Sequence, residues 1–260
     1  TATSALPCIT VADPMIMHIT KQALANAGPD DIICETQGSY LLASAAAGNY
    51  VSILWTTSGT GAFSNPTLIT PVYTPGAADI TSGSVILTLT AFGVVPCADS
   101  SNSMILTISR QAIVNAGPDA IICETQGSFS LSAATSSYST SLLWTSSGTG
   151  TFSNQAVLNP VYTPSVADIS GGSVILILTA TSASPCVNTS NAMTLTISRQ
   201  PIGSAGPDAT ICETQGSYAL ASASASYYSS VLWSTSGTGT FNNATIVNPV
   251  YTPGANDINT

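Results

Sequence analysis

Charge is scarce in this sequence, and basic charge is the scarcest. The 260 residues include three Lys or Arg and one His against 12 Asp or Glu, so the formal net charge is -9. Nucleic-acid binding by a basic face needs clustered side chains that neutralise phosphates, but Lys21, Arg110 and Arg199 lie far apart in the sequence. A polybasic membrane anchor is excluded for the same reason. We therefore expect no nucleic-acid partner and no binding to a charged membrane surface.

Long apolar runs and helical periodicity are also missing. No apolar run approaches the roughly 20 residues of a membrane helix, and no stretch repeats apolar residues at helical spacing between caps. Hydrophobic residues nevertheless make up 44% of the chain and the mean hydropathy is +0.36, which excludes a disordered chain. Only 6% of residues are charged, so Ser, Thr, Asn and Gly supply the polar surface. Such a surface is typical of secreted and cell-surface proteins, and we expect secretion and no membrane insertion.

The sequence repeats without slippage every 89 residues, as the spacing of Cys34, Cys123 and Cys212 shows. This period exceeds the 20–50 residues of common solenoid units and suits a small β-sandwich domain. We expect the last strands of a truncated repeat in residues 1–24, complete repeats in 25–113 and 114–202, and the front of a further repeat in 203–260. The sequence has no initiator Met or signal peptide and starts and stops beside one predicted core strand, which predicts a stretch of a longer polypeptide.

Short β-branched and aromatic runs between Gly, Pro, Asn and Ser clusters predict strands throughout. In the second complete repeat these fall at residues 120–123, 128–133, 141–145, around Phe152, and at 160–163, 173–181 and 191–198. Seven strands with turn signals every 8–12 residues indicate an immunoglobulin-like sandwich. The fold class expected is therefore all-β, with tandem immunoglobulin-like or PKD-like sandwiches. Because no long Gly/Ser linker separates the repeats, we expect a stiff rod.

One tryptophan per repeat is placed to fill the core of its sandwich. Trp55, Trp144 and Trp233 each lie on the predicted third strand. Burying a large side chain contributes roughly 1.5–3 kcal/mol. We therefore expect these three residues to be core residues on which the stability of each repeat depends.

The six cysteines form two classes with regular spacing. Cys34, Cys123 and Cys212 end the first predicted strand, and Cys8, Cys97 and Cys186 follow a proline between the last two strands. Regular cysteines in a secreted chain predict disulfides, and no CxxC motif or paired His supports a zinc site. The spacing slightly favours pairing within a repeat.

In that version Cys34 pairs with Cys97 and Cys123 with Cys186, which leaves Cys8 and Cys212 with partners outside this sequence. The sandwich topology leaves a second version open. The turn after the first strand and the loop between the last two strands usually lie at opposite poles, so Cys34 would meet the loop of the next repeat and pair with Cys186, provided that the Cα atoms lie within about 7 Å.

No catalytic site can be assembled from the repeats. The single His18 is replaced by Thr107 and Thr196 in the equivalent positions, so no Ser-His-Asp or Cys-His arrangement recurs. We expect no enzyme activity, no catalytic residues and no cofactor.

The recurring aspartates Asp30, Asp79, Asp119 and Asp168 are weak candidates for calcium, which prefers oxygen ligands. They are dispersed and lack a DxDxDG loop, so a structural role in turns, where Asp accepts backbone N–H bonds, is favoured.

The motifs of the second complete repeat resemble a known family of modules. They are AGPDAIIC from Ala116, LWTSSGTGTF from Leu143, NPVYTPSVADI from Asn159, GSVILILTA from Gly172 and PCVNTSNAMTLTIS from Pro185. This succession is similar to the tandem PKD-like or immunoglobulin-like repeats of giant secreted surface proteins of Bacteroidota, such as SprB-like gliding-motility adhesins. The resemblance covers all 260 residues. It implies β-sandwiches, export to the cell surface and a role as stalk, adhesin or extracellular filament, with no catalytic residues.

Two hypotheses for function follow. In the first, the chain is a structural segment that spaces and rigidifies an adhesin stalk or extracellular filament, its partners being neighbouring repeats and other copies. In the second, each repeat is a multivalent module that binds surface glycans or proteins through exposed aromatic residues near a variable turn, namely Tyr50, Tyr138, Tyr227 and Tyr228. As a variant of the first, the chain ends flank one missing strand, so that strand exchange between copies is an alternative to one continuous chain.

Overall fold

A computed structural model describes residues 2–3, 6–7 and 12–258 of the chain, so Cys8 lies outside the described residues. Contacts divide the chain into two compact units. One comprises Thr1–Ile113, Ser136–Ser141 and Ala180–Thr189, and the other comprises Val114–Thr135, Leu142–Thr179 and Ser190–Thr260. Strands dominate both, with only three α-helices of four to six residues and three single 3-10 turns among the described residues.

The first complete repeat is built from three sheets that enclose one core. The four-stranded sheet has the order β2-β9-β8-β5, a three-stranded sheet has the order β3-β7-β6, and β1 pairs with β4. The elements are β1 (Leu24–Asn26), β2 (Asp31–Cys34), a 3-10 turn (Glu35–Gln37), β3 (Tyr40–Leu41), β4 (Ala46–Gly48), β5 (Tyr50–Thr57), β6 (Ala62–Phe63), β7 (Val72–Thr74), α1 (Ala77–Ser82), β8 (Ser84–Gly93) and β9 (Ser100–Ser109).

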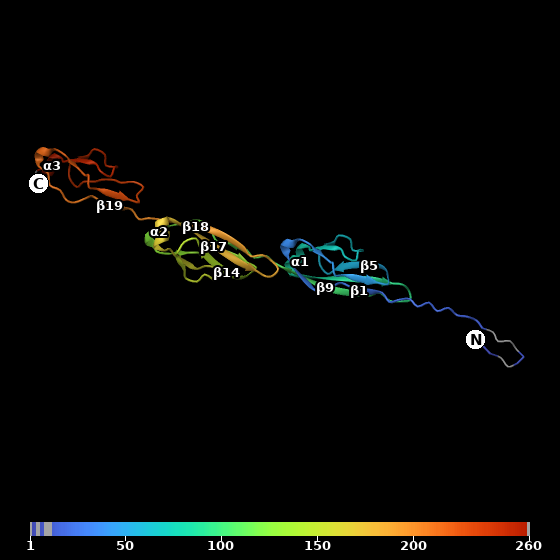
Figure 1. Cartoon of the computed structure of the whole chain (residues 1–260). Helices are drawn as coiled ribbons and strands as arrows, with labels where there is room; N and C mark the ends of the chain where they lie inside the picture. The colour runs from blue at the N-terminus through green and yellow to red at the C-terminus, as the bar shows by residue number, and fades with distance from the viewer. Residues whose placement is uncertain (1, 4–5, 8–11, 259–260) are drawn as a thin grey trace. The chain divides into compact units, whose positions relative to one another are not determined.

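Strands β8 and β9 form the spine of this repeat because every second residue is apolar. Successive strand residues point to opposite faces, so one face of β8 buries Val85, Leu87 and Leu89, each at most 3% exposed. The antiparallel register pairs Leu87 with Met104, which is also fully buried. Figure 1 shows β9 beside β1 in this repeat. The core lies on this face of the four-stranded sheet, where Trp55 of β5 and Tyr73 of β7 belong to the same buried cluster.

Strand β2 runs parallel to β9, and this pairing positions the cysteine at its end. The register places Asp31 opposite Leu106 and Cys34 opposite Ser109. Cys34 therefore lies at the end of β9 from which the chain leaves the repeat.

The second complete repeat has the same sheets, with the orders β11-β18-β17-β14, β12-β16-β15 and β10-β13. Its elements are β10 (Ile113–Asn115), β11 (Ala120–Cys123), a 3-10 turn (Glu124–Gln126), β12 (Phe129–Ser130), β13 (Thr135–Ser137), β14 (Ser139–Ser146), β15 (Thr151–Phe152), β16 (Val161–Thr163), α2 (Val166–Gly171), β17 (Ser173–Ser182) and β18 (Thr189–Ser198). Its core holds Trp144 and Tyr162, neither of them exposed at all.

Residues 203–258 contain fewer strands than the complete repeats. They form a sheet of order β20-β23-β22 and a pair β19-β21. The elements are β19 (Ile202–Ser204), a 3-10 turn (Glu213–Gln215), β20 (Tyr218–Ala219), β21 (Ser224–Ser226), β22 (Thr240–Phe241), β23 (Val250–Thr252) and α3 (Ala255–Ile258). No strand forms in residues 209–212 or 228–235, the segments that correspond to β2 and β5.

The predicted fold class is confirmed: the chain is all-β, with tandem immunoglobulin-like sandwiches. The seven predicted strands of the second repeat match β11, β12 and β14–β18, and every second residue in the middle of β17 and β18 is buried. The expectation that the chain contains no helix was wrong, because Ala77–Ser82 and Val166–Gly171 each form a short helix. The division of the chain into four sequence segments stays a prediction.

None of the helices in the described ranges has the length and apolar character needed to cross a membrane.

Candidate functional site at the junction between repeats

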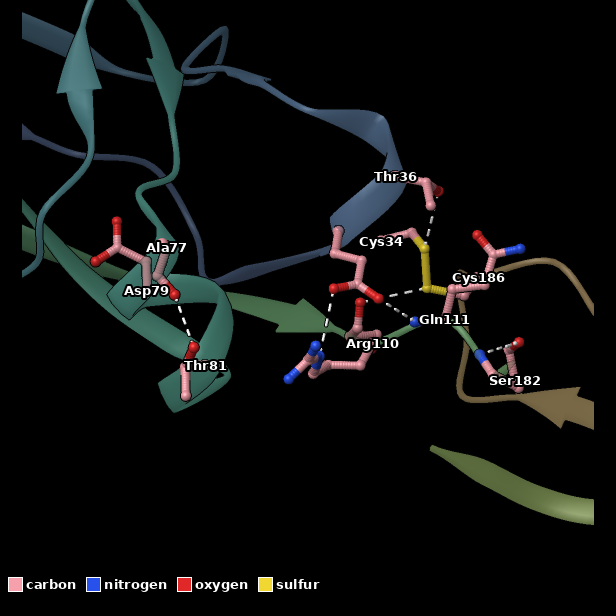
Figure 2. Close-up of polar contacts among 12 residues, drawn as sticks. Cys34, Thr36, Ala77, Asp79, Thr81, Arg110, Gln111, Ser182 and Cys186 are labelled. Carbon is pink, nitrogen blue, oxygen red and sulfur yellow. Dashed lines mark hydrogen bonds and ion pairs between the residues drawn. A yellow bond between two sulfur atoms is a disulfide. The ribbon is translucent and has the colours of Figure 1, made fainter. Parts of the chain in front are cut away.

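A disulfide links the two complete repeats of the sequence. Cys34 is bonded to Cys186, with 4.9 Å between the Cα atoms and 152 residues between them in the chain. Cys34 ends β2, and Cys186 lies in the turn between β17 and β18. Figure 2 shows this bond beside Arg110, Gln111 and Ser182. The disulfide therefore joins two modules that the sequence defines as separate units.

The pairing within a repeat, slightly favoured by the spacing, is wrong for Cys34 and Cys186. Cys34 lies beside Ser109 at the far end of β9, whereas Cys97 precedes the start of β9 at Ser100. Ten residues at about 3.3 Å each separate those ends by about 30 Å, well beyond the roughly 7 Å that a disulfide spans. The alternative pairing with the loop of the following repeat is the one found.

Glu35 forms the ionic part of this junction. Its Oε1 accepts a hydrogen bond of 2.9 Å from the backbone N–H of Gln111, and Nε of Arg110 lies 3.3 Å from Oε2. Arg110 also lies over the ring of Tyr138, with Cζ 4.1 Å from the ring centroid. One carboxylate at the end of β2 thus binds the segment that leads into the next repeat, and a cation–π contact fixes the arginine from the other side.

The polar contacts around the disulfide extend to the next repeat's loops. The Oγ of Ser182 accepts a hydrogen bond of 3.0 Å from the backbone N–H of Ala112, and the Oγ1 of Thr189 donates one of 2.8 Å to the carbonyl oxygen of Ala112. Both backbone groups of Ala112 are therefore satisfied by the second repeat.

The same junction recurs one repeat later. Glu124 accepts a hydrogen bond of 2.8 Å from the backbone N–H of Gln200 and lies 3.7 Å from Nε of Arg199. Arg199 lies over the ring of Tyr227 at 4.0 Å and donates a hydrogen bond of 2.7 Å to its hydroxyl. The junction is therefore a repeating feature of the chain.

The tyrosines at these junctions adopt a backbone conformation that non-glycine residues avoid. Tyr138 and Tyr227 have φ of 57° and 58°, in the left-handed region that is uncommon for bulky residues. The equivalent position in the first repeat is Asn49, also left-handed, where the preceding basic residue is Lys21 instead of Arg. Tyrosine therefore occurs where arginine is present to stack on it.

Three cysteines remain as thiols among the described residues, namely Cys97, Cys123 and Cys212. Their surroundings match those of the bonded pair. The hydroxyl of Thr125 donates a hydrogen bond of 3.1 Å to Sγ of Cys123, as Thr36 does to Cys34 at 3.2 Å. This bond lowers the pKa of the Cys123 thiol.

The loop cysteine Cys97 also repeats the position of its bonded equivalent. Sγ of Cys97 donates a hydrogen bond of 3.3 Å to the carbonyl oxygen of Thr20. Sγ of Cys186 lies at the same 3.3 Å from the carbonyl of Ser109, although the bonded sulfur has no proton to donate. Cys97 and Cys123 thus make the same hydrogen-bond contacts as their bonded equivalents Cys186 and Cys34.

The aspartates singled out for calcium accept hydrogen bonds from backbone N–H groups. Asp30 accepts the N–H of Ile105 and Asp119 that of Thr194, both at 2.7 Å. These partners lie 75 residues away, so the aspartates tie the loop before the first strand to the last strand instead of closing a local turn. No group of three or more acidic, His or Cys side chains that could hold a metal ion exists within the described residues.

Asp168 is a buried carboxylate that organises the loops of its repeat, as Asp79 does in the first repeat. It accepts hydrogen bonds from the backbone N–H groups of Thr149, Gly150 and Ser165 at 2.9–3.0 Å and from the hydroxyl of Tyr162. Burial would raise the pKa of Asp168, but these donors outweigh burial, so its pKa is lowered. Four hydrogen-bond donors therefore stabilise the ionised form of this buried carboxylate.

The tyrosine beside the equivalent carboxylate is perturbed in the opposite sense. Burial, followed by the hydrogen bond to Asp79, raises the pKa of Tyr73 to about 12. Tyr73 thus remains a hydrogen-bond donor throughout the physiological pH range.

The sequence anticipated some of these residues. It placed the tryptophans correctly in the two complete repeats, where Trp55 is 2% exposed and Trp144 is fully buried, while Trp233 is half-buried. It did not anticipate that Glu35 and Arg110 pair. The available signal was that one glutamate and one basic residue recur in each 89-residue period of a chain with very few charges.

Comparison with known proteins adds only distant structural similarity. No family model and no curated protein matches the chain. The I-band fragment I67–I69 of titin is 13% identical, covering 91% of this chain and 90% of that structure with a TM-score of 0.47. Immunoglobulin domains 1–5 of Sidekick-1 are 13% identical, covering 91% of this chain and 54% of that structure with a TM-score of 0.44.

The EC3–6 structure of protocadherin gammaB7 is 12% identical, covering 72% of this chain and 51% of that structure with a TM-score of 0.39. The chain spans about half the length of the protocadherin and Sidekick-1 structures. At these values the similarity carries no functional conclusion.

Proposed function

We propose that this chain is a structural segment of a secreted cell-surface adhesin stalk or extracellular filament, in which links between successive repeats keep the array together under tension. The observation that carries this proposal is the disulfide between Cys34 and Cys186, which joins residues of two successive 89-residue repeats. Its companions are the contacts of Glu35 with Arg110 and Gln111.

The position of the disulfide favours a mechanical role over a purely stabilising one. A disulfide inside one sandwich would stabilise that domain alone, whereas this one closes a loop that includes most of two repeats. In the chain-entropy model, closing so long a loop stabilises the folded state by roughly 4–5 kcal/mol. The disulfide also gives the two repeats a second covalent connection, in addition to the backbone around Gln111.

The remaining composition supports an extracellular setting. Disulfides form and persist in oxidising compartments, and a surface with only 6% charged residues relies on Ser, Thr and Asn for solubility. The resemblance of the repeat motifs to the modules of giant Bacteroidota surface proteins supports the same assignment. The repetition of the Glu–Arg junction suits a spacer, because stability then adds from one interface to the next.

Multivalent binding is the second candidate function, and one observation favours it. Tyr50 is 37% exposed and Tyr228 is 43% exposed, and exposed aromatic residues are common in binding surfaces. Tyr138 and Tyr227 are also exposed, but their rings are occupied by Arg110 and Arg199. A glycan array probed with the full chain tests this function, and binding that a Tyr228→Ala variant abolishes would support it.

Single-molecule pulling on the full chain tests the structural role. A chain extends by at most about 3.6 Å per residue, so the 152 residues between the cysteines hold back roughly 550 Å of length while the disulfide is intact. We expect this length to appear only after a thiol reductant is added. Release of the full length without reductant would overturn the proposal.

The matched control is the double variant Cys34→Ser with Cys186→Ser. It should release the same roughly 550 Å under oxidising conditions, at forces set by the two sandwiches alone. A second variant, Glu35→Gln, leaves the disulfide in place and should leave the held-back length unchanged.

A further inference from the structure

The four-stranded sheet of the first repeat has large aliphatic side chains on its outward face. Ile32, Ile86 and Ile105 are 44–46% exposed, although the outward positions of a β-sandwich are usually polar. The register places Ile86 directly opposite Ile105 on neighbouring strands, and Ile32 lies opposite Thr107, two residues from Ile105 along β9. These three isoleucines therefore form one exposed apolar cluster across β2, β9 and β8.

The second repeat has aliphatic side chains on the outward face of its own four-stranded sheet. One period after Ile32 and Ile86, Ile121 is 74% exposed and Ile175 is 46% exposed. Leu143 of β14, on the same face, is 47% exposed. Single exposed apolar residues are common on protein surfaces, but here they gather on one face and recur with the repeat. This outward sheet face is therefore a candidate interaction surface.

Charged side chains are almost absent from the two four-stranded sheets. Among all the residues of β2, β5, β8 and β9 and of β11, β14, β17 and β18, the single charged residue is Asp31. Its carboxylate accepts a hydrogen bond of 2.7 Å from the hydroxyl of Tyr40 in the other sheet, so it does not lie on the outward sheet face. Asp30 and Asp119, which precede β2 and β11, lie at the edge of the face, and each accepts one backbone N–H of the last strand. In a chain with a net charge of -9, a like-charged molecule can therefore approach this face with little repulsion.

Polar groups on the outward sheet face bond to one another. Thr88 and Ser103 lie directly opposite each other, two residues along the strands from the isoleucine pair, with 2.8 Å between their hydroxyl oxygens. In the second repeat the hydroxyl of Ser141 donates a hydrogen bond of 2.9 Å to that of Thr181. Covering a polar group is costly mainly where the group loses its hydrogen-bond partner. These pairs keep their partners, so the face can be buried at a lower cost than an ordinary polar surface.

We propose that the outward sheet face of each complete repeat packs against the same face of a second copy of this chain, so that copies associate side by side. Charge complementarity selects this partner. A basic partner would bind where the acidic residues lie, whereas an uncharged apolar face fits another uncharged apolar face, and a second copy supplies one. Contact between identical faces is self-complementary, and stacked sheets pack about 10 Å apart with their side chains interdigitated.

This inference goes beyond the proposed structural role, because a single chain can bear tension without a lateral partner. Since the face recurs every 89 residues, each repeat adds one more contact between the same two copies, and individually weak contacts add up to a stronger association. Lateral contacts of this kind join single chains into a bundle.

The response to salt distinguishes this contact from one made by ion pairs. Two copies that each have a net charge of -9 repel one another, and salt screens that repulsion without weakening an apolar contact. We therefore expect the dissociation constant to fall at least about threefold when the ionic strength rises from about 0.05 to about 0.5 M. A constant that rises over this range would contradict the proposal.

The test uses the full 260-residue chain with its free thiols alkylated by iodoacetamide, so that only non-covalent association is measured. Sedimentation equilibrium over a series of protein concentrations gives the dissociation constant. We expect dimers or larger oligomers with a dissociation constant below about 1 mM. A monomer at every concentration up to about 1 mM would overturn the proposal.

Variants with one added charge per repeat test which face makes the contact. Ile86→Asp combined with Ile175→Asp should raise the dissociation constant at least about tenfold, because each buries a charge in place of an apolar side chain. The matched control is Leu68→Asp combined with Val157→Asp, two residues one period apart that are 51% and 42% exposed and lie outside the strands of the four-stranded sheets. The control adds the same charge and should change the constant less than about threefold. Equal effects of the two double variants, both shown to be folded by circular dichroism, would contradict the proposed face.

A charge exchange identifies the partner as a second copy. A chain with Ile86→Lys and Ile175→Lys, mixed with the double Asp variant, should associate at least about tenfold more tightly than either variant alone, since opposite charges then meet across the interface. A mixture that associates no more tightly than the separate variants would overturn the face-to-face contact. The length held back by Cys34–Cys186 is measured on single molecules, so failure here leaves the structural role itself standing.

Discussion

The hydroxyl of Tyr162 donates a hydrogen bond of 2.8 Å to Oδ2 of Asp168, and both side chains are buried. Tyr73 and Asp79 form the same pair at 2.6 Å in the first repeat. The carboxylate of Asp168, in α2, also accepts hydrogen bonds from the backbone N–H groups of Thr149 and Gly150. The pair therefore connects the loop before β15 with α2 and with β16, the strand that carries Tyr162.

The stability of the second repeat should fall in acid because of Asp168. Its pKa is lowered in the folded state relative to 3.8, so its ionised form contributes stability above about pH 4 that is lost as the pH falls through the folded pKa. Asp168→Asn should cost about 2–3 kcal/mol at pH 7 and flatten the pH dependence below pH 4. Urea unfolding between pH 2 and 7 measures both effects.

The control for that experiment is Asp119→Asn. Asp119 is exposed and accepts one backbone hydrogen bond from Thr194, so its loss should cost about 1 kcal/mol or less. Equal losses for the two variants would contradict the role assigned to the buried carboxylate.

Gly148 should not tolerate a side chain. A Cβ atom at this position would collide with Oδ1 of Asp168 and touch Cγ2 of Val174. Gly148→Ala should therefore destabilise the repeat by roughly 1–3 kcal/mol through overpacking. Thermal unfolding of the purified variant measures the loss. The matched control is Gly171→Ala, where nothing lies within 4 Å of the added atom, and a melting temperature as low as that of Gly148→Ala would contradict this explanation.

Trp144 should dominate the core of its repeat. It is fully buried, and its Nε1 donates a hydrogen bond of 3.1 Å to the carbonyl oxygen of Leu158. Trp144→Ala should cost about 3–5 kcal/mol. The adjacent Leu143 is 47% exposed, so Leu143→Ala should cost less than about 1 kcal/mol. Denaturant titration of the two variants, followed by circular dichroism, measures the difference.

The ion pair of Glu35 and Arg110 should contribute modestly and depend on salt. Their side chains are 20% and 32% exposed, so solvent screens the attraction. A double-mutant cycle with Glu35→Gln and Arg110→Gln should give a coupling free energy of roughly 0.5–1 kcal/mol. That coupling should shrink as the ionic strength rises from 0.05 to about 1 M. A coupling insensitive to salt would contradict an ionic interaction between these two side chains.

The long strands were predictable because a run of β-branched and apolar residues is a local signal. Residues 174–178 form a continuous apolar run that predicts a strand, in which Val174, Leu176 and Leu178 are buried and Ile175 is 46% exposed. The helix Val166–Gly171 was missed because six residues span fewer than two turns, too few for a helical period to appear. The pairing of Ile113–Asn115 with Thr135–Ser137 was missed because each strand has only three residues, too few for a strand pattern to appear.

The junction was only partly predictable because it depends on contacts between distant residues. The sequence predicted that the cysteines form disulfides, but it could not decide which cysteines pair. The pairing depends on which end of β9 lies beside Cys34, and this follows from the parallel pairing of β2 with β9, which is a tertiary contact. Residues 209–212 show the same dependence. They share the sequence Ile-Cys with β2, yet they form no strand and pair with none among the described residues.

The disulfide of Cys34 and Cys186 also changes what a protease can achieve. Hydrolysis of any peptide bond between these two cysteines would leave both fragments joined through their sulfur atoms. Proteases usually cut exposed turns. Cleavage of any such turn between Cys34 and Cys186 would therefore not separate the molecule into two pieces. A protein exposed to foreign enzymes outside the cell would survive damage that would separate an unlinked chain of domains.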